Sequence, residues 1–255
     1  MEIIKISKKN KNTYEVTLKD LTKLNLFEDT IIYYNLLSNK KISQEELNEI
    51  TTYNASLGAY YKAINLINFK LRTKKEINDK LKKLNYSSDI ISNTIKRLEM
   101  EGYINDEKYL KSYINDQINL TLKGPNKIMT ELVKLGFSKD KIILLLDNYD
   151  SELWCEKINK IVAKKIKSNH NLSNNMFKEK LKKDLYNMGY YKELVDIILN
   201  SMEFDSDIDI LKKEYEKEYK KLSRKYEGST LYNKIKYSLY KKGFSLENIE
   251  SIMNG

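Results

Sequence analysis

A short pattern that occurs four times constrains the fold of this 255-residue chain more than any other feature. Each copy has an aliphatic residue, a leucine four positions later, a glycine or asparagine after four more, and then an aromatic residue. The leucines are Leu81, Leu132, Leu185 and Leu239, which lie 51, 53 and 54 residues apart. Apolar residues at this spacing form one stripe on a helix, and a lone helical hairpin cannot bury such a stripe. The pattern therefore predicts stacked helical repeats that share a core.

Each copy is expected to contain two helices joined by a tight turn. The glycine or asparagine can adopt the left-handed conformation that ends a helix, and a serine after the aromatic residue can cap the next helix in three copies. An acidic residue then falls in the first turn, where the helix dipole favours negative charge. In the first copy a third helix follows, opened by Asn105 or Asp106. The turn residues are Asn85, Gly136, Gly189 and Gly243, the serines are Ser87, Ser138 and Ser245, and the acidic residues are Asp89, Asp140, Glu193 and Glu247.

The first 20 residues have a different periodicity. Apolar and polar residues alternate around Ile4 and Ile6 and again around Tyr14, Val16 and Leu18, with KKNKN between them. This alternation predicts a two-stranded hairpin. Because a hairpin alone is marginally stable, residues 21 to 36 are expected to pack on it as a short strand and a helix.

Two capping boxes mark helix starts between the hairpin and the repeats. Ser43 with Glu46 predicts the start of a helix that runs to about Phe69, and Thr73 with Glu76 predicts the start of the first repeat. In each box the hydroxyl accepts a backbone hydrogen bond that a helix start would otherwise leave unmade.

Two further segments carry helix signals. Pro125 follows Gly124 at the start of the second copy, where a proline in the first helical turn is tolerated. Residues 204 to 228 are expected to form a long charged helix that Gly228 ends. Its predicted apolar stripe is Ile210, Leu211, Tyr215, Tyr219 and Leu222.

These signals predict a mainly α fold: tandem three-helix repeats stacked into an elongated, curved solenoid, with a small N-terminal β-hairpin region. The expected domains are 1–42 for the hairpin and a short helix and 43–70 for a connecting helix. The repeats are expected at 71–122, 123–172 and 173–228, with a partial fourth repeat at 229–255.

Composition excludes several classes of protein. No run of about 18 apolar residues is present, as a membrane helix would need, and the first residues lack the apolar core of a signal peptide. One cysteine cannot form an internal disulfide, and one histidine cannot build a histidine-based metal site. We therefore expect a cytoplasmic protein without metal or cofactor.

The residues able to carry catalysis are few and scattered. The chain has no phosphate-binding GxxxxGK[ST] or GxGxxG motif. His170 lies in a polar linker, and Cys155 follows Trp154 in an apolar stripe, where a buried core thiol is expected. Asp106 and Glu107 are adjacent and so point to different sides of a helix, and capping accounts for Asp106. The sequence therefore predicts a protein that is not an enzyme.

The formal charge of +10 has two explanations. It indicates a nucleic acid or another polyanion as partner, or it reflects a lysine-, isoleucine- and asparagine-rich composition with no such role. The charge is patterned: residues 70 to 83 hold seven basic and two acidic residues, and residues 157 to 167 hold five lysines and no acidic residue. Acidic clusters lie between them, one of which is Asp147, Asp150, Glu152 and Glu156.

Three groups of residues carry a resemblance to the RecX family, regulators of the RecA recombinase. The match runs from about residue 60 to the C-terminus. Leu71, Leu110 and Leu135 depart from residues usual in that family. The matching groups are Arg72, Thr73 and Glu76; Gly102, Tyr103, Asn105, Asp106 and Tyr109; and Lys123, Gly124, Pro125, Ile128, Glu131 and Leu132.

The resemblance implies a non-enzymatic, monomeric modulator of recombination, DNA repair and the SOS response. It would lie in the groove of a RecA filament on single-stranded DNA, and would most simply inhibit filament extension, ATP hydrolysis and strand exchange. The hairpin and the extra C-terminal copy are similar to the longer RecX forms of Gram-positive bacteria.

The candidate contacts with RecA or DNA are basic residues on the first helices of the copies. Each of them taken singly can also be an ordinary solvated side chain. The candidates are Arg72, Lys74, Lys75, Lys82, Lys83, Lys127, Lys134, Lys182, Lys183, Lys241 and Lys242.

Two other functions stay open at this point. One is a sequence-indifferent DNA-binding protein that acts without RecA on single-stranded or double-stranded DNA. The other is a helix-turn-helix regulator that reads DNA sequence, which the acidic residues expected in the helix first turns disfavour, because they would face phosphates with the wrong sign.

Overall fold

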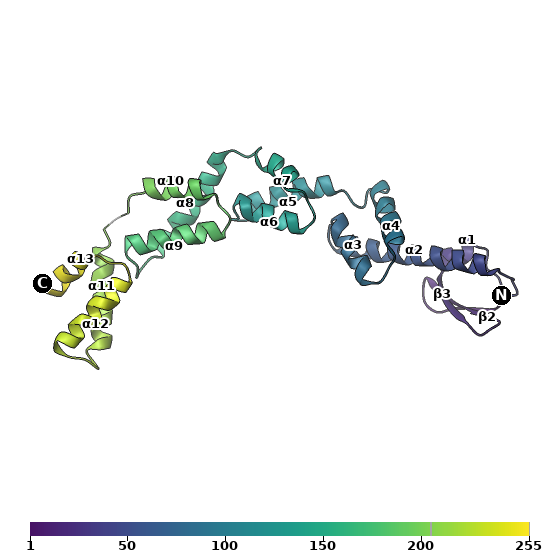
Figure 1. The fold of residues 1–255 in the computed structure, drawn as a ribbon, viewed down its shortest axis with the longest axis horizontal. Coiled ribbons are helices and arrows are strands. Elements are labelled where there is room, and N and C mark those ends of the chain that lie inside the picture. The colour runs from purple at the N-terminus through teal and green to yellow at the C-terminus, as the bar shows by residue number, and fades with distance from the viewer. Residues whose placement is uncertain (205, 255) are drawn as a thin grey trace. The chain divides into compact units, whose positions relative to one another are not determined.

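The computed structural model describes residues 1–204 and 206–254, and thirteen helices and three strands lie in them (Figure 1). The expected mainly helical fold with a small β region at the N-terminus is confirmed. The chain divides into two compact units, Met1–Ser112 and Tyr113–Gly255. Across the described residues, no helix has both the length and the apolar character that crossing a lipid bilayer requires.

The N-terminal sheet has three antiparallel strands in the order β1 (Ile3–Lys8), β2 (Thr13–Leu18) and β3 (Lys23–Phe27). β1 and β2 form the predicted hairpin, with Ile3 opposite Leu18. β3 is the expected extra strand, and α1 (Glu28–Tyr33) follows it directly. Ile3, Val16, Leu18 and Leu26 form a core with Ile50 of the next helix, so burial on one face holds the sheet in place.

Helix α2 (Gln44–Phe69) begins where the first capping box predicts. The Ser43 hydroxyl accepts a hydrogen bond from the Glu46 amide at 3.0 Å. The Glu46 carboxylate instead forms an ion pair with Lys40 at 3.3 Å, so this box is half formed. The Thr73 and Glu76 box is complete and starts α3 (Lys74–Lys83).

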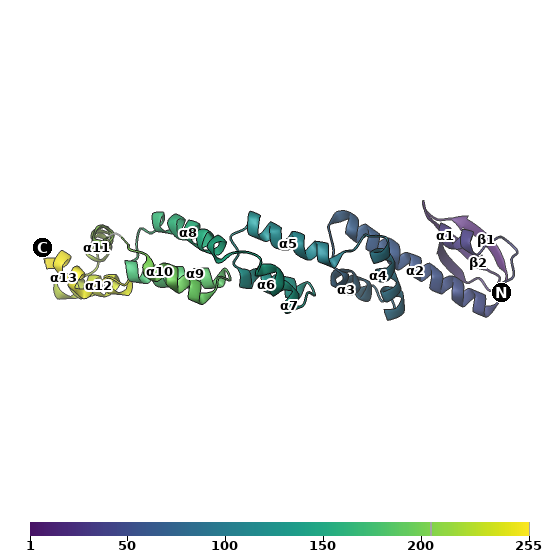
Figure 2. The ribbon, with the colours of Figure 1, turned by 90° about the horizontal axis from the view of Figure 1, so that it is seen from above.

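The second half of α2 packs against α3 and α4 (Ser88–Met100), as Figure 2 shows. Ala59 and Ala63 of α2 are fully buried against Ile77 and Leu81 of α3 and Ile91 of α4. Because Ala59 and Ala63 are small, the α3–α4 hairpin can pack close to the backbone of α2. The repeat leucine of the first copy is therefore a core residue, as the pattern predicts.

The second unit continues with helices of the same kind. They are α5 (Asp106–Leu120), which begins in the first unit, α6 (Pro125–Lys134), α7 (Lys139–Leu146), α8 (Ser151–Lys167), α9 (Asn174–Asn187), α10 (Lys192–Ser201), α11 (Ile208–Leu222), α12 (Gly228–Lys241) and α13 (Leu246–Asn254). α8 packs with α9 and α10, and α11 packs with α12 and α13. The predicted domain ranges begin each repeat at its hairpin and stay a prediction.

All four predicted turn residues have positive φ angles. The values are 62° for Asn85, 102° for Gly136, 90° for Gly189 and 85° for Gly243. An acidic residue stands in the first turn of the helix that follows each of them. The repeat signal thus corresponds to a helix end and a helix start in every copy.

The turn of the third copy contacts the start of the second copy. The Gly124 amide donates a hydrogen bond to the Met188 carbonyl at 2.8 Å, and the Asn126 amide donates one to the Gly189 carbonyl at 2.9 Å. The first amides of a helix lack partners within it, and these carbonyls supply them. A Cβ on Gly189 would lie 2.4 Å from the backbone nitrogen of Lys127, so only glycine fits there.

A related contact recurs one copy later. The Ser173 amide donates to the Lys242 carbonyl at 3.1 Å, and a Cβ on the neighbouring Gly243 would lie 2.5 Å from the Ser173 hydroxyl oxygen. In the contact between the second and third copies, Tyr190 adds a hydrogen bond to the Leu122 carbonyl at 2.9 Å. Burial raises the pKa of Tyr190 to about 12, so its hydroxyl remains a donor.

Three expectations about the C-terminal half are wrong. α11 ends at Leu222, where its apolar stripe stops, and Gly228 is the first residue of α12 rather than the end of α11. Tyr219, expected in that stripe, is 48% exposed, and Asp205 at the start of the segment lies outside the described residues. Cys155 is half-buried instead of being a core thiol.

Candidate interaction surfaces

Arg72 and Lys74 stand at the start of α3 and are both tied to acidic residues. The Arg72 guanidinium lies 2.8 Å from the Glu76 carboxylate, and Lys74 forms an ion pair with Glu99 of α4. The hydrogen bond to Glu99 raises the pKa of Lys74. Lys74 therefore links α3 to α4, and Arg72 is paired with a residue in the first turn of α3 itself.

Lys82 and Lys83 lie in the last turn of α3, and both are exposed. Within residues 1–204 and 206–254, neither of them forms an ion pair. Lys75, in the first turn of the same helix, is also exposed but does have an interaction within the chain. The end of α3 thus presents two positive charges to solvent.

Candidates of the second and third copies divide in the same way. Lys127 and Lys183 are exposed and without an ion pair in the described part of the chain, whereas Lys134 is exposed but has a partner. Lys182 is half-buried and lies 3.1 Å from the Asp196 carboxylate of α10. Of these two neighbours, only Lys183 has an exposed ammonium group that forms no ion pair within the described residues.

Lys241 and Lys242 are adjacent and have opposite environments. The Lys242 ammonium donates to the buried carboxylates of Glu214 and Glu218 on α11, the latter at 2.8 Å. Burial works against the charge of Lys242, but these two hydrogen bonds outweigh it and raise its pKa. Lys241 is exposed and lies 4.5 Å above the ring of Tyr237.

The α11–α12 hairpin carries a basic and aromatic hollow of 530 Å³ that the sequence reasoning missed. Its lining includes Lys221, Lys234, Tyr226 and Tyr237, and the Lys234 ammonium lies 4.5 Å from the centre of the Tyr226 ring. The sequence does contain a signal for such a surface, because tyrosine and lysine residues are interleaved in the segment YNKIKYSLYKK. Rings beside ammonium groups suit stacked bases and phosphates.

Part of the basic stretch 157 to 167 is structural. Lys157 is buried, and its ammonium donates to the carbonyls of Ile118 and Thr121, the second at 2.7 Å, which closes the C-terminal end of α5. Burial, with a smaller contribution from Lys160, lowers its pKa. Lys165 forms an ion pair with Asp184 of α9. The ammonium groups of Lys157 and Lys165 are thus bound within the fold and stabilise it.

Asp106 has a role that the sequence did not indicate. Asn105, not Asp106, caps α5, because the Lys108 amide donates to the Asn105 side chain at 2.8 Å. The Asp106 carboxylate accepts a hydrogen bond from the Lys74 amide at 3.0 Å and so caps α3.

The same device occurs in the second unit, where the Asp207 carboxylate accepts from the Asn174 amide at 2.9 Å and caps α9. In both cases an aspartate at the start of a long helix caps the N-terminal end of the first helix of a hairpin.

His170 is exposed, as expected for a linker. Among the described residues, no three His, Cys, Asp or Glu side chains gather closely enough to hold a metal ion.

The fold defines a protein class: a mainly helical protein built of tandem three-helix units. Residues 59–98 match the family model described as RecX, first three-helix domain. The chain is 32% identical over 254 residues to the regulatory protein RecX of Listeria monocytogenes, covering 98% of this chain and 94% of that protein. It is 33% identical over 265 residues to that of Streptococcus uberis, covering 100% and 99%. The chain therefore belongs to the RecX family and has a RecX-type regulatory role.

Solved structures agree in fold. A crystal structure of regulatory protein RecX superposes with a TM-score of 0.62 at 23% identity, over 78% of this chain and 99% of that one. The crystal structure of RecX from Lactobacillus salivarius superposes with a TM-score of 0.52 at 29% identity, over 58% and 96%.

Proposed function

We propose that this chain is a non-enzymatic cytoplasmic regulator that binds the RecA filament on single-stranded DNA. Binding inhibits filament extension, ATP hydrolysis and strand exchange. Family membership supports the regulatory role, and the resemblance in its motif residues supports RecA as the target. The candidate basic residues then act by contact with phosphates or with acidic protein surface.

One observation carries this proposal: some candidate lysines have no acidic partner within the described residues, and others do. Lys82, Lys83 and Lys183 are exposed and form no ion pair there, and Lys127 is exposed with only a longer-range attraction to Glu131. An exposed ammonium that is already paired within the chain contributes little to an outside partner, whereas an unpaired one can release counterions on binding a polyanion. The unpaired set is therefore the proposed contact surface.

The test compares two double variants of the full chain. Lys82→Glu with Lys83→Glu reverses the charge at the end of α3. The control, Lys62→Glu with Lys96→Glu, makes the same charge change at two exposed positions of the same unit. Inhibition of RecA ATP hydrolysis on single-stranded DNA is titrated at low and moderate salt. We expect about tenfold weaker inhibition and a shallower salt dependence for the first variant only. Equal potency of the two variants contradicts the proposed surface.

A second candidate function is single-stranded DNA binding without RecA. The basic and aromatic hollow on the α11–α12 hairpin favours it, since Tyr226 and Tyr237 each lie beneath an ammonium group. Measuring binding to bare DNA alongside the effect on RecA ATP hydrolysis distinguishes the two functions. A protein that binds bare DNA tightly but leaves RecA ATP hydrolysis unchanged has the second function and not the first.

A further inference from the structure

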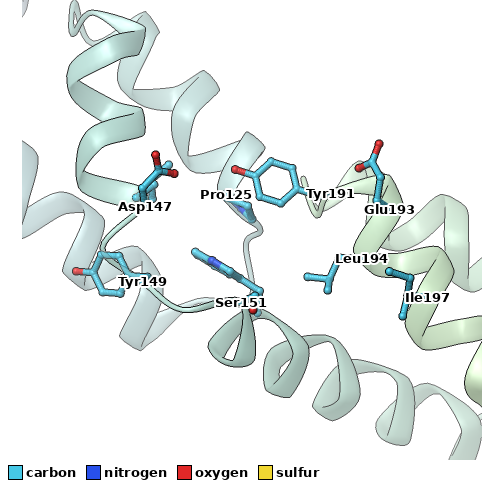
Figure 3. A pocket seen from close by; sticks show the side chains of 10 residues that line it. Pro125, Asp147, Tyr149, Ser151, Tyr191, Glu193, Leu194 and Ile197 are labelled. Carbon is cyan, nitrogen blue, oxygen red and sulfur yellow. The ribbon is translucent and has the colours of Figure 1, made fainter.

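A groove of 570 Å³ lies on the second unit, between the start of α6, the end of α7, the start of α8 and α10 (Figure 3). Its apolar lining includes Leu146, Trp154, Leu194 and Ile197. Trp154 is only 4% exposed and forms a firm part of the wall, whereas Ile197 is 68% exposed. Together these two side chains give the groove an apolar area that is open to solvent.

The charged residues of this groove are all acidic. Asp147 and Glu193 belong to its lining, which contains no lysine or arginine. Both carboxylates are exposed, and neither forms an ion pair in the part of the chain that the structure describes. Tyr191 stands between them in Figure 3, and burial together with Asp147 raises the pKa of its hydroxyl. On a chain of net charge +10, this groove has the opposite sign to the lysine surfaces.

We propose that the groove binds a segment of a protein partner that presents a lysine or arginine beside an aliphatic or aromatic side chain. The apolar side chain would contact Trp154 and Ile197, and the cation would pair with Asp147 or Glu193, which lie on either side of Tyr191. DNA does not fit, because its phosphates would meet two unpaired carboxylates. The inference rests on the proposed function and deepens it: the partner is RecA, and this groove contacts RecA protein and not the DNA in the filament.

With this groove, the chain has two kinds of binding surface that differ in chemistry: the exposed lysines and the groove itself. The exposed lysines attract phosphate or acidic surface at long range, and their effect weakens with salt. The groove acts by burial of apolar area and by short-range charge pairing, which depends less on salt. A variant of the groove therefore weakens filament binding at all salt concentrations and does not weaken binding to bare DNA.

The first experiment places a photo-crosslinking amino acid at Ile197 in the full chain and adds RecA filaments on single-stranded DNA. Ile166 of α8, 40% exposed and outside the groove lining, is the control position. We expect crosslinks to RecA at least about fivefold more abundant from position 197, mapping to a RecA segment with a basic residue beside an apolar one. Crosslinks only to DNA or to a second copy of this chain, or equal yields from both positions, overturn the inference.

The second experiment measures binding to filaments and to bare single-stranded DNA. Ile197→Lys removes the apolar contact and adds a repelling charge, and Asp147→Asn with Glu193→Gln neutralises the acidic pair. The controls are Ile166→Lys and Asp116→Asn with Glu216→Gln, which make the same changes at other exposed positions of the second unit. We expect about tenfold weaker filament binding for both groove variants, unweakened DNA binding, and controls within about twofold of the parent.

The outcomes separate the two proposals. If the parent protein binds no RecA filament, the proposed function and this inference both fail. If the parent binds filaments and the groove variants bind equally well, the groove inference alone fails. Far-ultraviolet circular dichroism of each variant checks that the fold is retained.

Discussion

Gly124 and Gly189 lie backbone to backbone: a Cβ on Gly124 would stand 2.4 Å from the carbonyl carbon of Gly189. Through this contact, carbonyls in the turn of the α9–α10 hairpin accept hydrogen bonds from amides at the start of α6, which belongs to the preceding copy. Any side chain at either position would force the two apart. The repeat glycine therefore ends a helix and also joins one copy to the next.

Gly189→Ala should destabilise the second unit strongly. Its φ of 90° disfavours a side chain by about 1–2 kcal/mol, and the clash with Lys127 adds about 1–3 kcal/mol of overpacking. Gly228→Ala is the matched control, because Gly228 also has a positive φ but nothing lies within 4 Å of its Cβ position. Urea unfolding followed by circular dichroism measures both. Equal losses in the two variants would show that the close contact adds nothing.

Lys242→Met should cost about 3–5 kcal/mol of unfolding free energy, because it leaves the buried Glu218 carboxylate without its ion-pair partner and the buried Glu214 carboxylate with only the exposed Lys217. The adjacent Lys241→Met removes an exposed lysine and should cost less than about 0.5 kcal/mol. Chemical denaturation of the two variants side by side tests this difference. A loss at Lys241 as large as that at Lys242 would contradict the assignment of Lys242 to the fold.

Stability should fall in acid partly through Glu218. The hydrogen bond from Lys242 holds the pKa of this carboxyl below its usual value in the folded state. The unfolded chain therefore binds more protons, so the contribution is complete above about pH 4.5 and is lost as the pH falls through the folded pKa. Urea midpoints measured between about pH 5 and about pH 3 should drop less steeply in Lys242→Met. Parallel curves for parent and variant would rule out this coupling.

Asp106→Ala should destabilise the first unit by about 0.5–2 kcal/mol, because the Lys74 amide at the start of α3 loses its acceptor. Asp106→Asn keeps an acceptor oxygen and should recover most of this loss. Thermal unfolding of both variants measures the effect. The prediction fails if asparagine is as damaging as alanine, since charge rather than capping would then be the cause.

Lys157→Met should cost about 1–3 kcal/mol, because the carbonyls of Ile118 and Thr121 lose their donor. Lys160→Met on the same helix changes a side chain that is 72% exposed and should be nearly neutral. Urea unfolding compares the two, and hydrogen exchange should show the greatest loss of protection at the C-terminal end of α5. Unchanged protection there would contradict the closing role of Lys157.

Local signals in the sequence were sufficient for most helix ends. Asn85, Gly136, Gly189 and Gly243 were predictable because a left-handed residue after an apolar stripe ends a helix through its own backbone preference. The complete capping box of Thr73 is equally local, since both partners stand within one turn. The end of α11 at Leu222 was missed because Gly228 was assigned to the wrong helix.

The candidate surface was less predictable, because the use of a lysine depends on residues distant in sequence. Lys241 and Lys242 are neighbours in the chain, yet one faces solvent and the other is bound by carboxylates of α11. Lys157 belongs to a basic stretch and still closes a helix 36 residues away at Thr121. In the sequence, a lysine that faces solvent and a lysine that is bound within the fold look the same, because each adds one positive charge.

By itself, the sequence determined the repeat, the helix ends and the hairpin of the first residues, because these depend on periodicity and on capping within a few residues. Only the tertiary structure decided which lysines are free, that Asp106 and Asp207 cap helices other than their own, and that Asp147, Glu193 and Ile197 share one groove. These relationships join segments tens of residues apart. They follow from how the helices pack, which no local preference specifies.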